Sequence, residues 1–87
     1  MINKDDMNIL KEYMYKIQNY IEPEETEAVI FTAVSKAEKK KLTLIKGESI
    51  AVQATAMSIL REICERLDSS EKENLKAAID FLIFKEN

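Results

Sequence analysis

Residues 23–41 read PEETEAVIFTAVSKAEKKK, and this stretch decides the fold class of the chain. Its middle, residues 29–34, is rich in β-branched residues and would suit a strand if it stood alone. Glutamates precede this middle and lysines follow it, an order that complements the dipole of a helix at both ends. Pro23 is also well placed for the first position of a helix. We therefore predict a helix over residues 23–41.

Hydrophobic periodicity predicts three further helices, over residues 4–21, 49–67 and 70–85. The helix over 4–21 has an apolar stripe spaced by steps of three and four residues: Met7, Leu10, Met14, Ile17 and Ile21. The helix over 49–67 is apolar around most of its girth, which is typical of a buried helix. The predicted fold is all-α: a small bundle of four helices, with the third at the centre, forming a single helical domain over residues 1–87.

The segment 42–47, LTLIKG, is the hardest part of the chain to assign. We interpret it as a loop that packs back on the core, and a short strand or an early start of the next helix stays open. Gly47 is expected to adopt a positive φ angle before that helix. At the start of the last helix, Ser70 and Glu73 have the spacing of a capping box.

The composition excludes several classes of functional site. The chain has no His, one Cys and one Gly, so it lacks the residues for a Ser-His nucleophile, a zinc cluster or a glycine-rich phosphate loop. We therefore predict no enzymatic activity, no cofactor and no metal. The single Cys, the absence of a signal-peptide pattern and the absence of an apolar run of about 20 residues favour a cytoplasmic protein without a membrane contact.

The first and last predicted helices carry more apolar surface than one packing contact requires. On each, a second line of apolar and aromatic residues lies beside the inner stripe. Tyr and Phe supply large contact areas and are enriched at protein interfaces. We predict that these lines meet a partner chain or a second copy: Ile9, Tyr13, Tyr20, Ala77, Phe81 and Phe84.

Charged residues give two further candidate surfaces. A basic patch, with a role in binding an anionic partner, consists of Lys36, Lys39, Lys40, Lys41 and Lys46. We interpret it as the solvated end of a helix, because the formal net charge of the chain is −3 and nucleic-acid-binding domains are typically basic. An acidic patch, with a role in docking on a basic target, consists of Glu22, Glu24, Glu25 and Glu27.

These observations favour a small, non-enzymatic regulatory or accessory protein that acts through protein–protein contacts as a homodimer. The preference for Lys over Arg, with only Arg61 and Arg66, suggests an AT-rich genome, and we interpret the chain as an accessory protein of a mobile element or phage. Two alternatives stay open. One is an inhibitor or immunity-type protein that docks its acidic surface on a target. The other is a nucleic-acid-associated accessory protein that uses the basic patch of residues 36–46.

Overall fold

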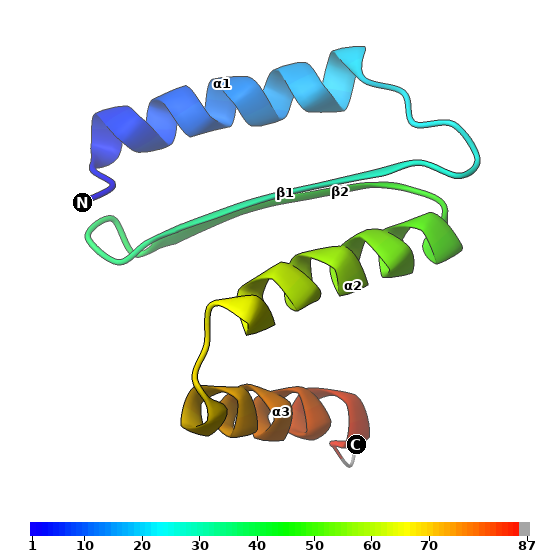
Figure 1. Ribbon diagram of the computed structural model, residues 1–87. Coiled ribbons are helices and arrows are strands. Elements are labelled where there is room, and N and C mark those ends of the chain that lie inside the picture. The colour runs from blue at the N-terminus through cyan, green and yellow to red at the C-terminus, as the bar shows by residue number, and fades with distance from the viewer. Residues whose placement is uncertain (86–87) are drawn as a thin grey trace. The chain divides into compact units, whose positions relative to one another are not determined.

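The computed structural model describes residues 1–85, and in that range the chain forms three helices and one two-stranded antiparallel sheet (Figure 1). In chain order the elements are α1 (Lys4–Tyr20), β1 (Ala28–Ser35), β2 (Lys40–Gly47), α2 (Ser49–Glu65) and α3 (Ser69–Phe84). This is an α+β arrangement, so the predicted all-α bundle of four helices is wrong. The chain divides into two compact units, Met1–Ala56 and Met57–Asn87, which we describe separately. Residues 86 and 87, which the predicted domain 1–87 includes, lie outside the described residues.

The error lies in residues 23–41, which form strand β1, a turn and the start of β2 instead of a helix. Charges at helix ends contribute only about 0.3–1 kcal/mol each. The strands β1 and β2 instead form eight cross-strand pairs, from Ala28 with Gly47 to Ser35 with Lys40, and each such pair contributes about 0.2–1 kcal/mol. The two contributions are similar in size, so the burial of one apolar face of the sheet under α1 decides in favour of the strand. Residues 42–47, interpreted as a loop, are part of β2.

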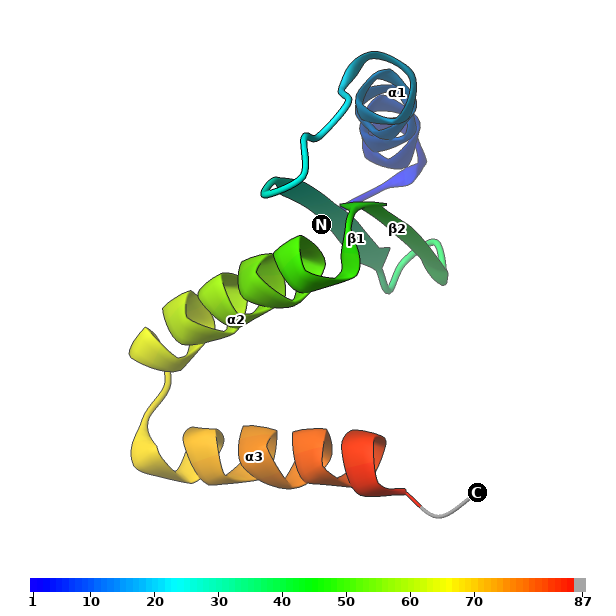
Figure 2. The ribbon, with the colours of Figure 1, turned by 90° about the vertical axis from the view of Figure 1, so that its right-hand side faces the viewer.

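One face of the hairpin is covered by α1. Side chains alternate across a strand, and the register places the pairs Phe31–Leu44 and Ala33–Leu42 on the same face. Helix α1 turns its predicted stripe toward this face: Met7 is buried at 2% exposure, and Leu10, Met14 and Ile17 are half-buried. Figure 2 shows α1 end-on against one side of the hairpin. The N-terminal unit is therefore built on the hairpin, with α1 as its cover.

The opposite face of the hairpin is more exposed. Val34 and Ile45 both lie on it and are exposed, and the hydroxyl oxygens of Thr32 and Thr43 lie 3.4 Å apart across the strands. At the open end of the hairpin, Gly47 has φ +131°, which confirms the predicted positive φ. A Cβ there would lie 2.7 Å from the carbonyl oxygen of Glu27, so the close approach of the strands also requires glycine.

The prediction that the third of the four helices is central is wrong as well. That segment is α2, and its buried residue is Ala51. Its large apolar residues Ile50, Met57, Ile59 and Ile63 are exposed. A central helix would bury most of these side chains.

The C-terminal unit contains the end of α2 and all of α3. Half-buried apolar residues on both sides of the connecting turn are Leu60, Cys64, Leu67, Leu75 and Ile79. Helix α3 begins with a capping box formed by Asp68 and Glu71, two residues earlier than the box predicted at Ser70 and Glu73. None of the residues of α3 is buried.

Candidate interaction surfaces

The predicted interface residues of α1 form a single exposed stripe. Ile9, Tyr13 and Tyr20 are separated by four and seven residues, so they lie on the same side of the helix. Their exposed fractions are between 51% and 76%, whereas the part of the inner stripe that lies within α1 is buried or half-buried. Ile21, the last residue of the predicted stripe, follows the helix and is 46% exposed. Helix α1 therefore has one apolar side on the hairpin and one partly aromatic side in solvent.

The predicted interface residues of α3 lie in the C-terminal unit. Ala77, Phe81 and Phe84 are exposed and follow one side of the helix. Their neighbours Leu82 and Ile83, which are not among the predicted interface residues, are exposed as well. With them, the last turn of α3 carries four consecutive large apolar side chains, Phe81–Phe84, with exposed fractions between 64% and 75%. We call these four residues the apolar helix end.

The predicted basic patch is divided by the hairpin. Lys36 and Lys39 lie in the turn between the strands, and Lys40 and Lys41 begin β2. Lys46 lies near the other end of β2, where its ammonium group contacts the end of α1. The first four lysines therefore come together through the hairpin, and Lys46 is separated from them.

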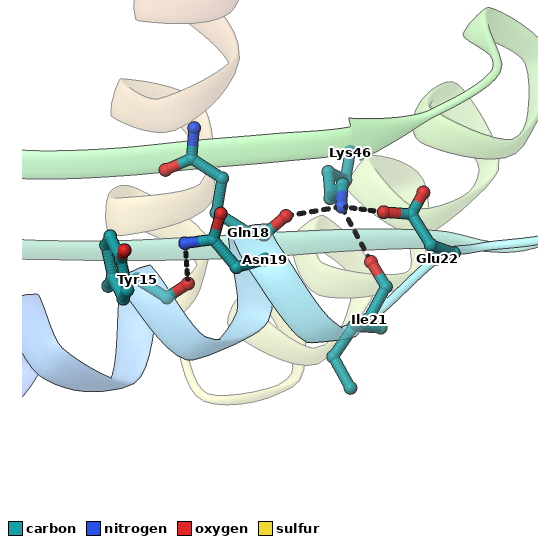
Figure 3. A network of polar contacts seen from close by, with 6 residues as sticks. All are labelled: Tyr15, Gln18, Asn19, Ile21, Glu22 and Lys46. Carbon is teal, nitrogen blue, oxygen red and sulfur yellow. Dashed lines mark hydrogen bonds and ion pairs between the residues drawn. The ribbon is translucent and has the colours of Figure 1, made fainter.

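Lys46 has a local structural role that Figure 3 shows in detail. Its Nζ donates hydrogen bonds to the carbonyl oxygens of Gln18 and Ile21, both at 2.7 Å, and to Oε1 of Glu22 at 3.0 Å. The last carbonyl groups of a helix have no partner within the helix, so a lysine at this place satisfies them and complements the helix dipole. The side chain of Lys46 is 20% exposed and that of Glu22 is 81% exposed.

The turn has a fixed backbone, to which sequence reasoning assigned no role. We call residues 35–41 the hairpin tip. Ser35 is 2% exposed; its hydroxyl donates to the carbonyl oxygen of Ile2 at 2.7 Å and accepts from the N–H of Glu38 at 3.1 Å. The N–H of Lys39 donates to the carbonyl oxygen of Lys36 at 3.3 Å. The lysines of the tip also line an open hollow of about 430 Å³.

The predicted acidic patch lies in the loop before β1. Glu22 pairs with Lys46, and the carboxylate of Glu27 accepts a hydrogen bond from the N–H of Glu24 at 2.9 Å. Two of its four carboxylates therefore have partners within the loop and its neighbourhood.

Two further observations concern residues 1–85 as a whole. Within that range, His, Cys, Asp and Glu side chains form no group of three or more that would hold a metal ion. In the same range, no helix combines the length and the apolar character that crossing a bilayer requires.

The surfaces described above are inferred from this chain alone. Comparison with protein-family models, with curated protein sequences and with solved structures finds no match to this chain.

Proposed function

We infer that this chain is a non-enzymatic accessory protein that acts through protein–protein contacts as a homodimer. The observation that carries the inference is the exposure of the apolar helix end, Phe81–Phe84. Successive residues of a helix are rotated by about 100°, so four in a row point in four directions around the axis. A single neighbouring element cannot cover all four. A helix that is apolar on all sides requires an environment that surrounds it.

A second copy of the chain supplies such an environment. Two copies of the C-terminal unit contribute four helical segments, and packing them around a common two-fold axis produces a bundle of four helices. The apolar helix end offers about 500 Å² of contact area per chain, taking each large side chain at its usual size. A stable interface needs about 800 Å² per partner. The exposed residues Met57, Ile59 and Ile63 of α2 belong to the same unit and add to this area.

The accessory and non-enzymatic part of the proposal rests on the composition. The chain has no His, and the described residues form no metal-binding group. The single Cys, which has no partner for an internal disulfide, is compatible with a reducing compartment such as the cytoplasm. An accessory protein of this kind acts by occupying a surface of another protein, and the exposed stripe of α1 is available for that contact.

The test is the absolute mass in solution, measured by light scattering after size exclusion over a range of protein concentrations. We expect a mass of twice 10.0 kDa for the wild type. The double variant Phe81→Asp, Phe84→Asp should be a monomer with an unchanged helical signal in circular dichroism, because neither side chain is buried within the chain. A wild type that stays monomeric at about 100 μM would overturn the dimer, since a standard-sized interface holds at lower concentrations.

A matched control distinguishes the two exposed apolar surfaces. The double variant Tyr13→Asp, Tyr20→Asp makes the same type of change on α1, and we expect it to remain dimeric. Loss of the dimer in this variant alone would assign the interface to α1 and would contradict its assignment to the apolar helix end. If the α3 variant loses its helical signal, the single variant Leu82→Gln, a milder change in the same turn, replaces it in the comparison.

A further inference from the structure

The hairpin tip concentrates positive charge in an acidic chain. It contains four lysines and one glutamate, a formal charge of +3, whereas the formal charge of the whole chain is −3. All four lysines are exposed. Within the described residues none of them forms an ion pair, since the two ion pairs found there involve Lys46 and Lys76. The charge of the tip is therefore not neutralised locally.

Within the N-terminal unit, five of the nine acidic residues lie at the other end of the hairpin: the four glutamates of the loop before β1, and Glu48 after β2. Glu22, Glu24, Glu25 and Glu27 precede β1, and the tip follows it; Figure 1 shows the turn near the N-terminus and the acidic loop at the far end of the strands. Eight strand residues span about 26 Å, more than twice the Debye length of about 10 Å at 0.1 M salt. Near the tip, Lys4, Asp5 and Asp6 add a formal charge of −1 to the +3 of residues 35–41, so the formal charge there stays positive at +2. An approaching polyanion therefore meets the lysines without strong repulsion.

The backbone of the tip presents these lysines in a fixed arrangement. Ser35 ties the turn to Ile2 and to Glu38. Lys39 has φ +52°, and it is the residue of the described chain, other than glycine, with a positive φ. Gly or Asn adopts this conformation at lower cost. At this position the chain therefore has a charged side chain where Gly or Asn would make a more stable turn.

Lysines project from several sides of the hairpin at once. Lys40 is paired with Ser35 and lies on the face covered by α1. Lys41 is paired with Val34 and lies on the opposite face. Lys36 and Lys39 lie in the turn between the strands. A two-stranded antiparallel ribbon fits the major groove of B-form DNA, whose walls are lined by phosphates. At the end of the hairpin Lys40 and Lys41 are both exposed, so positive charges from its two faces are presented to the two walls.

We propose that the hairpin tip enters the major groove of duplex DNA and binds its phosphate backbone through Lys36, Lys39, Lys40 and Lys41. The binding is independent of sequence, because the four lysines contact phosphates and the tip has no Arg, Asn or Gln to read base edges. Single strands are disfavoured because residues 35–41 include no aromatic side chain for base stacking. Duplex RNA is disfavoured because its major groove is too narrow. An anionic membrane is disfavoured because a flat surface contacts one side of a ribbon.

The experiment measures the affinity of the full chain for a fluorescently labelled DNA duplex of 24 base pairs, by anisotropy, between 50 and 200 mM NaCl. Four phosphate contacts predict a slope of log K against log salt of about −3.6, which is a loss of roughly 100-fold in affinity over this range. A duplex RNA of the same sequence and vesicles with phosphatidylserine serve as competing ligands. We expect both to bind at least tenfold more weakly than DNA at 50 mM.

Matched variants separate a local contact from a general charge effect. The triple variant Lys39→Glu, Lys40→Glu, Lys41→Glu should abolish binding, whereas Lys11→Glu, Lys16→Glu, Lys72→Glu changes the net charge by the same amount and should retain most of it. The single variant Lys39→Gly should weaken binding severalfold and leave the melting temperature unchanged or higher. The monomeric α3 variant should keep the slope of a single tip, so the proposal does not depend on the dimer.

Three outcomes would overturn the proposal. The first is no binding of the wild type to duplex DNA at 50 mM NaCl. The second is an equal loss of affinity in the two triple variants, which would assign the effect to net charge. The third is binding of RNA or vesicles as tight as that of DNA, which would remove the groove as the feature recognised.

Discussion

Lys46 is the residue on which the contact between β2 and the end of α1 depends. An ammonium group has three N–H donors, and each of the three acceptors lies within 3.0 Å. Lys46→Met keeps the aliphatic stem and removes all three bonds. We expect the free energy of unfolding to fall by about 1–2 kcal/mol, since water partly replaces the bonds at this half-buried place. Urea unfolding measures the change.

Lys41→Met is the matched control for that measurement. Lys41 lies in the same strand but is exposed and has no ion-pair partner among residues 1–85. Its replacement should change stability by no more than about 0.5 kcal/mol. Equal effects of the two variants would mean that the bonds of Lys46 contribute nothing to the fold.

At the level of elements, Ser35 connects the turn of the hairpin to the residues before α1. Its hydroxyl accepts the N–H of Glu38 and donates to the carbonyl oxygen of Ile2. Ser35→Ala leaves both groups without this partner at a buried position, so we expect a loss of about 1–2 kcal/mol in the free energy of unfolding. Ser58→Ala, at an exposed place on α2, should be nearly neutral. Comparable stability of the two variants in urea would show that water replaces the hydroxyl of Ser35.

The elements also show what a sequence can predict. The three helices lie within about two residues of the predicted ranges, because their periodicity and end signals are local. The same holds for Gly47, whose positive φ follows from its place between two elements. The helix predicted over residues 23–41 was wrong because a strand is stabilised by its partner strand, which lies elsewhere in the sequence. Leu42 and Leu44 on either side of Thr43, followed by the β-branched Ile45, were the signal for that partner. The interpretation of residues 42–47 as a loop left this signal unused.

The candidate surfaces were likewise predictable where their residues are close in sequence, and not where strand pairing arranges them. The stripes of α1 and α3 were predictable because each lies on one helix, and the structure shows them exposed. The basic patch was assembled from residues close in sequence, and the hairpin separates Lys46 from the other four lysines. Ser35 was missed because Ile2 lies 33 residues away in sequence, and because the turn that contains Glu38 was predicted to be helix.

At the level of the whole molecule, the few buried apolar residues bear on how folding is stabilised. In the described chain they are Met7, Leu42 and Ala51, all in the N-terminal unit. Burial of apolar surface is the main favourable contribution to folding, so a chain with so little of it is marginally stable alone. Association that covers the apolar helix end stabilises the folded state by mass action. Folding and assembly of this protein should therefore be coupled.

This coupling predicts that the melting temperature depends on protein concentration. For a dimer that unfolds to two separate chains, a tenfold increase in concentration adds about 1.4 kcal/mol of stability per dimer, which corresponds to about 3–5 °C for a chain of this size. Thermal unfolding followed by circular dichroism between about 5 and 500 μM measures the shift. The monomeric variant Phe81→Asp, Phe84→Asp should melt at a lower temperature that does not change with concentration. A wild type whose melting temperature is equally constant would show that each chain is stable by itself, and the exposed apolar helix end would then have no part in folding.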